Sequence, residues 1–401
     1  MVLYRKYRPQ KLADIVGQEH VVETLLASLV SGKISHGYLF AGPRGTGKTT
    51  WVKKSFPFAL YIDLLKDDTY KELLARPSRL ENIIPKKFSD WIIIDEVQRV
   101  PNLLNEVHRL IEEKHYRFVL TGSSARKLRA KGVNLLAGRA LLCHFYPLTS
   151  VELGGHFDLK HALQFGFLPG VYNGQDPKQY LDSYVKAYLR EEVLQEGLIR
   201  NIAAFAHFLE VASFSQGGML NMSEIARECA IDRKAVAHYF SILEDLLIAY
   251  RLPVFTKKAK RRLVAHEKFY FFDTGVYRTL KPSGPLDSHE DAEGAALETV
   301  VLQQLMAINE YRQYGYKIYF WRTSNNQEVD FILYGQRGLI AIEVKRSSKI
   351  ASKQLSGLKA FAKEYPMAKT FLFYGGEQRY SFDRIEVWPI IEGLKQIDKM
   401  L

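Results

Sequence analysis

A glycine-rich segment that ends in lysine and threonine directly follows an apolar run, residues 38–41. Glycines let backbone N–H groups wrap a phosphate, and the N-terminus of a following helix adds its dipole. We therefore expect a P-loop in which Lys48 reaches the β- and γ-phosphates of ATP and Thr49 binds Mg²⁺. The residues expected to line this nucleotide site are Gly42, Pro43, Arg44, Gly45, Thr46, Gly47, Lys48, Thr49 and Thr50.

A second apolar run, residues 91–94, ends in the acidic pair Asp95 and Glu96. A continuous apolar run is typical of a buried parallel strand, and α/β folds place their chemistry at the C-terminal ends of such strands. We expect Asp95 to hold the Mg²⁺ through water and Glu96 to polarise the water that attacks the γ-phosphate.

Two further polar residues are candidates for this site. Ser123 ends the next apolar run and would either contact the γ-phosphate or belong to a plain turn. Arg139 would be an arginine finger, acting in cis or on a neighbouring subunit, or else a solvated arginine.

Charged residues also stand in a segment near the C-terminus that otherwise reads as a buried β-hairpin, EVDFILYGQRGLIAIEVK (328–345). If Tyr334 pairs with Leu339, one face is an apolar core face and the other places Asp330 opposite Glu343. Carboxylates directly across a ladder repel each other, and Mg²⁺ or Mn²⁺ between them would remove that cost. The alternative is a surface patch whose acids are neutralised by Arg337, Lys345 and Arg346.

A third carboxylate belongs to a helical pattern that precedes the hairpin. Residues 289–308 carry an apolar stripe through Ala295, Leu302 and Leu305, and Glu298 lies on that stripe. A carboxylate on a core-facing stripe is rarely left unpaired, so Glu298 should have a partner.

The composition indicates a globular chain with a polyanionic partner. With 401 residues the chain is long enough for two or three domains, and its net charge of +12 favours binding to DNA, although a basic surface also aids solubility. Two cysteines are too few for a disulfide framework or a cysteine-type zinc site, which fits the cytoplasm. We expect no membrane span and no leader, and self-association into a homo-oligomer is compatible with the pattern.

The middle of the chain reads as mostly helical. Residues 147–215 suit a helical lid over the nucleotide, and residues 217–273 read as helix, turn, helix and a hairpin with the basic tip 257–262. We expect a winged helix, with Ser223 as the cap of its first helix, that binds DNA or serves only to dock a protein. The second helix offers Arg233, Lys234 and His238 to DNA.

Two family resemblances rest on these motifs. Residues 3–50 resemble the start of the bacterial clamp-loader γ/τ subunit of DNA polymerase III, which implies adenine contacts from Arg8, Pro9, Val16 and Gly17. The cysteine quartet that binds zinc in that subunit is missing. From residue 38 the chain is similar instead to prokaryotic AAA-type ATPases with a C-terminal domain of unknown function, through YIDLLKDD, IIIDEVQRVPNLL, LTGSSARKL and KFYFFDTGVYRTL.

The order of a helix with Glu, then a hairpin with Asp and Glu-x-Lys, resembles the PD-(D/E)XK nuclease fold. The resemblance implies that Glu298, Asp330 and Glu343 bind Mg²⁺. It also implies that Lys345 stabilises the attacking hydroxide or the phosphorane.

Together these observations predict an α/β chain with four parts: a P-loop ATPase core (1–146), a helical lid (147–215), a winged helix (216–284) and a nuclease-like α/β domain (285–401). The expected function is an ATP-binding and ATP-hydrolysing AAA-type ATPase that acts on DNA and carries an Mg²⁺-dependent nuclease-like domain. One alternative is a nucleotide-dependent switch whose C-terminal domain only binds DNA or protein. Another is a clamp-loader subunit, against which the missing cysteine quartet argues.

Overall fold

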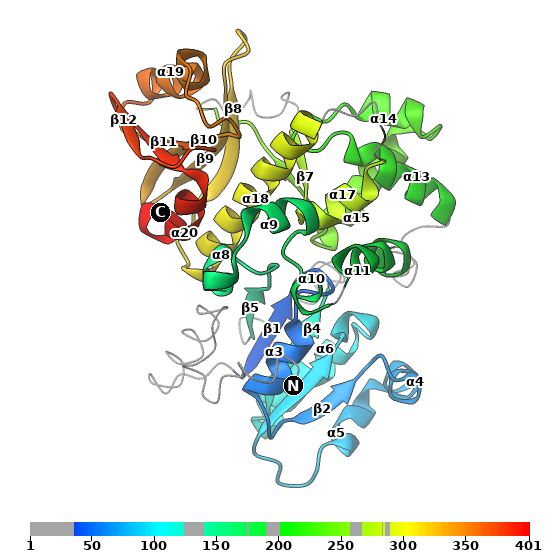
Figure 1. Cartoon of the computed structure of the whole chain (residues 1–401). Coiled ribbons are helices and arrows are strands. Elements are labelled where there is room, and N and C mark those ends of the chain that lie inside the picture. The colour runs from blue at the N-terminus through cyan, green and yellow to red at the C-terminus, as the bar shows by residue number, and fades with distance from the viewer. Residues whose placement is uncertain are drawn as a thin grey trace. The chain divides into compact units, whose positions relative to one another are not determined.

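The computed structural model describes residues 36–123, 140–174, 176–189, 201–256, 267–282, 284 and 289–401. The chain divides into two compact units (Figure 1). The first unit runs to Pro147 and also includes residues 245–247, and the second unit comprises residues 148–244 and 248–401.

The first unit is built on a five-stranded parallel sheet with the strand order β2-β3-β4-β1-β5. The apolar runs read from the sequence form its strands, which confirms the expected parallel α/β fold with a P-loop. The elements are β1 (Gly37–Ala41), α3 (Lys48–Ser55), β2 (Leu60–Asp63), α4 (Asp67–Ala75), η2 (Pro77–Arg79), α5 (Leu80–Ile83), β3 (Trp91–Asp95), η3 (Val97–Arg99), α6 (Leu103–Lys114), β4 (Arg117–Gly122) and β5 (Ala140–His144).

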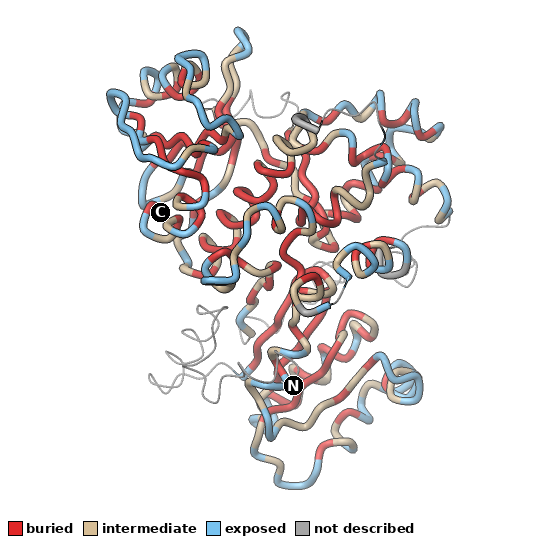
Figure 2. The backbone as a smooth tube through the Cα atoms, in the orientation of Figure 1, coloured by how far each residue is buried: buried red, intermediate tan, exposed pale blue. Residues whose placement is uncertain are grey.

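Helices cover both faces of this sheet, so its strands are apolar on both faces. Ile92 and Ile94 of β3 pack in one cluster with residues of α4 and α6. Ile93 packs in the other cluster, with Val52 of α3. The tube in Figure 2 is accordingly buried along β1, β3 and β4. A sheet held from both sides fixes the C-terminal ends of its strands, where the predicted nucleotide site lies.

The second unit begins with helices, and the expected helix-turn-helix follows. Its first part contains α8 (Ser150–Leu153), η5 (Gly154–His156), α9 (Leu159–Phe165), α10 (Pro169–Asn173), α11 (Pro177–Ser183), the π-helical η6 (Tyr184–Leu189), α13 (Ile202–Ser213), α14 (Met222–Glu228), α15 (Arg233–Asp245), β6 (Ala249–Leu252), β7 (Lys268–Phe271) and α17 (Thr274–Leu280).

The local details of this part correct one expectation. The cap of α14 is Asn221, whose side chain accepts the N–H of Glu224, and Ser223 lies inside the helix. An asparagine can cap as well as a serine, so the sequence allowed either start. The strands β6 and β7 pair antiparallel, as a wing requires. The basic tip 257–262 lies outside the described residues, and the winged helix stays a prediction.

The last part of the chain is a six-stranded mixed sheet with the order β12-β13-β11-β10-β9-β8. The hairpin β9–β10 is antiparallel, whereas β10–β11 and β11–β13 are parallel. The elements are α18 (His289–Tyr311), β8 (Lys317–Arg322), β9 (Glu328–Gly335), β10 (Gly338–Lys345), η7 (Ser352–Leu355), α19 (Ser356–Glu364), β11 (Lys369–Tyr374), β12 (Tyr380–Phe382), β13 (Ile385–Pro389) and α20 (Ile390–Met400).

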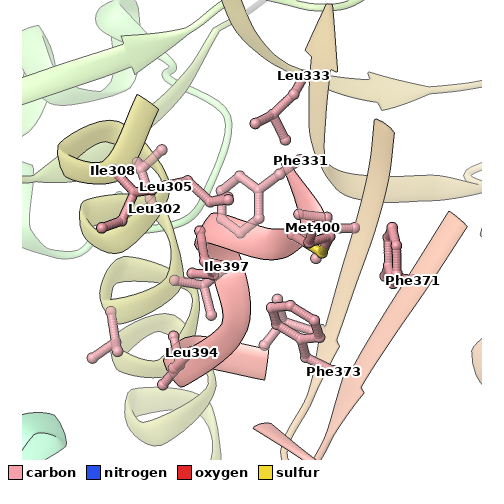
Figure 3. Close-up of a cluster of buried hydrophobic side chains, with 14 of the residues drawn as sticks. Leu302, Leu305, Ile308, Phe331, Leu333, Phe371, Phe373, Leu394, Ile397 and Met400 are labelled. Carbon is pink, nitrogen blue, oxygen red and sulfur yellow. The ribbon is translucent and has the colours of Figure 1, made fainter. Parts of the chain in front are cut away.

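The hairpin has the predicted register, with Tyr334 opposite Leu339. The expectation of a single core face is wrong, because apolar clusters bury the hairpin from both sides. Figure 3 shows one cluster, in which Leu305 of α18 and Ile397 of α20 gather with Phe331 of β9. Ile332 belongs to the other cluster, with residues of α19. No helix among the described residues is both long enough and apolar enough to span a membrane.

Candidate functional site

The P-loop takes its shape from its glycines. Gly47 has φ 88° and Gly45 has φ 84°, a left-handed conformation that residues with a side chain rarely adopt. A Cβ on Gly42 would meet the Phe145 carbonyl oxygen at 2.4 Å. Helix α3 begins at Lys48, directly after Gly47, with no side-chain cap. The loop therefore leads from β1 directly into the N-terminus of α3, which is the order of elements that the sequence predicted for a phosphate-binding loop.

The side chain of Lys48 folds back onto the backbone of the P-loop. Its ammonium donates to the carbonyl oxygens of Gly42 at 2.6 Å and of Pro43 at 2.8 Å, and the side chain is buried. Thr46 also donates to Pro43, at 2.9 Å. A buried ammonium held on carbonyl oxygens is a strong donor for phosphate oxygens, since charge–charge contacts with phosphate are stronger than bonds to neutral carbonyls.

Asp95 is the polar centre of the site. It is buried, and it accepts the Thr49 hydroxyl at 3.1 and 3.2 Å together with the hydroxyls of Tyr61 and Thr121. Burial and the bond to Asp95 raise the pKa of Tyr61, so Tyr61 donates its proton to the carboxylate. The structure thus joins Thr49 and Asp95, the two residues expected to hold Mg²⁺, and their hard oxygen atoms fit that ion.

Glu96 follows Asp95 in a strained conformation, with φ 60°. Gln98 donates to the Glu96 carboxylate and, at 3.0 Å, to the Ser123 hydroxyl. The Glu96 N–H donates to Thr121 at 3.2 Å. A left-handed glutamate at a strand end is typical of a functional site. These bonds orient Glu96 and bring Ser123 into the same network.

Sequence reasoning missed three members of this site: Tyr61, Gln98 and Thr121. Strand register could have found Thr121, because Ile94 pairs with Leu120, and Asp95 and Thr121 directly follow these two residues. Five of the expected residues lie outside the described residues: Arg8, Pro9, Val16, Gly17 and Arg139.

A second cluster of charged side chains lies where the predicted nuclease-like residues are. Asp330 of β9 and Glu343 of β10 are buried, and Lys345 contacts Glu343 at 2.5 Å and Asp330 at 3.8 Å. Backbone N–H groups complete the hairpin part: Val344 donates to Asp330 at 2.9 Å, and Asp330 donates to Glu343 at 3.3 Å.

Lys268, which was not predicted, connects this hairpin to the helix α18. Its ammonium lies 3.6 Å from Glu298, 3.6 Å from Asp330, and in contact with Glu328. Tyr270, two residues on along β7, donates its hydroxyl to Glu298 at 2.7 Å. The structure therefore gathers the four predicted residues of this site, Glu298, Asp330, Glu343 and Lys345, and adds a buried lysine.

The electrostatics follow from burial and neighbouring charge. Burial, reinforced by the Asp330 charge, raises the pKa of Glu298 and of Glu343. For Lys268, burial opposes the charged form, but the nearby carboxylates outweigh it and raise the pKa of that ammonium. Lys268 is thus a fixed positive charge among the acids.

This arrangement does not fit the Mg²⁺ that the sequence led us to expect at Glu298, Asp330 and Glu343. Within the described residues no three His, Cys, Asp or Glu side chains are placed to hold a metal ion together. The physical reason is that the Lys268 ammonium, 3.6 Å from both Glu298 and Asp330, already supplies a positive charge beside these acids.

The alternative of a surface patch is also wrong, because Asp330 and Glu343 are 4% and 6% exposed. Of the cations considered for that patch, Lys345 does pair with the acids. Arg346 instead pairs with Glu293, and Arg337 lies over the Tyr314 ring.

Comparisons with known families match three successive parts of the chain. Residues 36–154 match a family described as an AAA domain. Residues 156–287 and 293–392 match two families, each described as a domain of unknown function (DUF8612 and DUF4143). The last match covers the sheet with the carboxylate cluster.

Individual proteins match different lengths of the chain. The chain is 26% identical over 351 residues to an uncharacterized protein of Mycobacterium tuberculosis, covering 85% of this chain and 77% of that protein. It is 59% identical to the DNA polymerase III subunit tau of Bacillus subtilis over only 51 residues, which is 13% of this chain and 9% of that protein. The clamp-loader resemblance is therefore local.

Among solved structures, a Walker-type ATPase of Pyrococcus abyssi is 16% identical, with a TM-score of 0.45, covering 68% of this chain and 98% of that one. The family match, the parallel sheet and the geometry of Lys48, Thr49 and Asp95 agree with one another. Residues 36–154 therefore have an α/β P-loop fold and are similar to an AAA domain.

Proposed function

We propose that the first unit binds ATP with Mg²⁺ and hydrolyses it. The observation that carries this proposal is the hydrogen bond from the Thr49 hydroxyl to the Asp95 carboxylate, 3.1 Å long, because it joins the P-loop to the acid at the end of β3. Thr49 and Asp95 would hold the Mg²⁺, which when bound neutralises charge on the phosphates.

The residues of the chain have separate roles in this reaction. Lys48 exchanges its two carbonyl partners for phosphate oxygens and so binds the nucleotide. Glu96 accepts a hydrogen bond from the attacking water and draws its proton away. Gln98 positions Glu96. Its side-chain amide donates to the Glu96 carboxylate, and a second hydrogen bond from the same amide to the Ser123 hydroxyl holds the Gln98 side chain in place.

The test is ATP turnover measured together with nucleotide binding. Lys48→Ala should lose binding, and Glu96→Gln should bind ATP normally while turnover falls by about 10² to 10⁴. Lys54→Ala is the matched control, since Lys54 is an exposed lysine of the same helix. Turnover in Glu96→Gln equal to that of the unchanged protein would remove Glu96 from its role.

We further propose that the second unit binds DNA. The helix α15 exposes Arg233, Lys234 and His238, and it is the second helix of the helix-turn-helix. Basic side chains on such a helix suit phosphate and base-edge contacts, and the chain has a net charge of +12. A role as a protein-docking module is the competing function.

Binding of a fluorescent duplex, followed by anisotropy over a range of salt concentrations, separates these two functions. The double variant Arg233→Ala/Lys234→Ala should bind more weakly and show a smaller salt slope. Lys363→Ala, an exposed lysine of α19, is the control. Unchanged binding and slope in the double variant would favour protein docking.

A further inference from the structure

Lys268 belongs to a strand that is fixed in the core. In β7 its neighbours Phe269, Tyr270 and Phe271 are at most 1% exposed. The Phe269 carbonyl accepts the Gly217 N–H at 2.8 Å, and the Phe269 N–H donates to Gly218 at 3.0 Å. On its other side β7 pairs with β6. The lysine cannot leave the carboxylates by a movement of β7 without exposing these aromatic side chains and breaking both sets of backbone bonds.

The acids around Lys268 require a positive charge. Glu298, Glu328 and Asp330 lie around its ammonium, and only 5% of the Lys268 side chain is exposed. Buried carboxylates that share a site repel one another strongly, and a cation among them offsets part of that repulsion. In a metal-dependent nuclease a divalent ion has that role. Here the covalently attached ammonium has it.

The three cations around the acids differ in how deeply their side chains are buried. Lys345 is 34% exposed and forms ion pairs with Glu343 and Asp330. Arg322 lies 3.5 Å from Glu328 and is 31% exposed. Lys268 is the most deeply buried of the three, and it alone of them contacts both α18 and β9, through Glu298 and Asp330.

We propose that Lys268 takes the place of the divalent ion in this nuclease-like site, so that the carboxylate cluster of the second unit is complete without metal. The proposal concerns the second unit alone and does not depend on ATP hydrolysis in the first. It has two consequences: the unchanged protein holds no divalent ion at Glu298, Asp330 and Glu343, and removal of the Lys268 amine creates a site for one.

The test is a Mn²⁺ titration of the nucleotide-free full chain, followed by electron paramagnetic resonance of the free ion. All proteins carry Asp95→Asn, which removes the metal-binding acid of the first unit. The protein with Lys268 should bind no Mn²⁺ that depends on Glu343. Lys268→Ala should gain a Mn²⁺ site, and adding Glu343→Gln should abolish it. Lys268→Arg keeps a cation at this position and should gain none.

Thermal unfolding gives a second readout for the same variants. Mn²⁺ should raise the Tm of Lys268→Ala and leave the Tm of the Lys268 protein and of Lys268→Arg unchanged. If the protein with Lys268 binds Mn²⁺ and Glu343→Gln removes that binding, the proposal is overturned even if Lys268→Ala does not fold. A folded Lys268→Ala that gains no Mn²⁺ site also overturns it.

Discussion

The ammonium of Lys268 on β7 lies 3.6 Å from a carboxylate oxygen of Asp330 on β9, and both side chains are 5% exposed. The pair connects the two-stranded sheet β6–β7 to the six-stranded sheet. A buried ion pair adds little net stability relative to an apolar pair, but the loss of one partner leaves an uncompensated charge. The folding of the second unit should therefore depend on Lys268.

Lys268→Ala should lower the free energy of unfolding by about 3–5 kcal/mol, measured by urea unfolding with a chelator present. Lys345→Ala should lower the free energy of unfolding by clearly less, because the Lys345 side chain is 34% exposed and water can solvate the carboxylates that it leaves behind. Equal losses in the two variants would mean that burial does not set the importance of these lysines.

Tyr61→Phe should weaken the apparent affinity for Mg²⁺ in ATP turnover. The Tyr61 hydroxyl donates to Asp95, and its loss leaves that carboxylate to Thr49 and Thr121. We expect a higher Mg²⁺ concentration for half-maximal turnover, with unchanged nucleotide affinity when Mg²⁺ is absent. Tyr116→Phe, a partly buried tyrosine of the same unit, should change neither quantity. A loss of affinity without Mg²⁺ would contradict this role.

Two helical glycines should respond in opposite directions to alanine. A Cβ on Gly357 of α19 would meet the Glu328 carbonyl oxygen at 2.0 Å, whereas a Cβ on Gly294 of α18 meets nothing within 4 Å. Gly357→Ala should lower the free energy of unfolding by about 1–3 kcal/mol, because α19 must move away from β9. Gly294→Ala should raise the free energy of unfolding by about 0.5–1 kcal/mol, because alanine has the higher helix propensity. Chemical denaturation measures both, and a shared sign would contradict the close approach of α19 to β9.

The raised pKa of Asp273 implies that the stability of the fold depends on pH. It is buried and accepts the N–H groups of Phe167, Gly275 and Val276, and burial raises its pKa to about 6. The native state thus binds the proton more tightly than the unfolded chain, whose aspartates have a pKa of about 3.9. Stability should therefore be greatest below pH 4 for this group and fall by about 3 kcal/mol as pH rises through 6.

The matched variant for this prediction is Asp273→Asn. Its amide nitrogen would face the Phe167 N–H, so the variant should be less stable, but it cannot titrate. The difference in unfolding free energy between the two proteins should change between pH 4 and pH 6.5. A constant difference across this window would show that the Asp273 pKa is not raised.

The sequence predicted those features that depend on neighbouring residues in the chain. The P-loop between β1 and α3, the acid at the end of β3 and the pairing of Tyr334 with Leu339 all follow from local patterns. Lys268 was missed because its partners Glu298 and Asp330 are far from it in sequence. A signal existed, since a lysine beside the aromatic run 269–272 needs a buried partner for the same reason that Glu298 does.

Crystals soaked with Mn²⁺ and a non-hydrolysable ATP analogue, followed by anomalous diffraction, test both units in one measurement. The account predicts an anomalous peak beside Thr49 and Asp95 and none among Glu298, Asp330 and Glu343, where Lys268 supplies the charge. An anomalous peak within the second group, or none beside Thr49 and Asp95 when the analogue is bound, would contradict it.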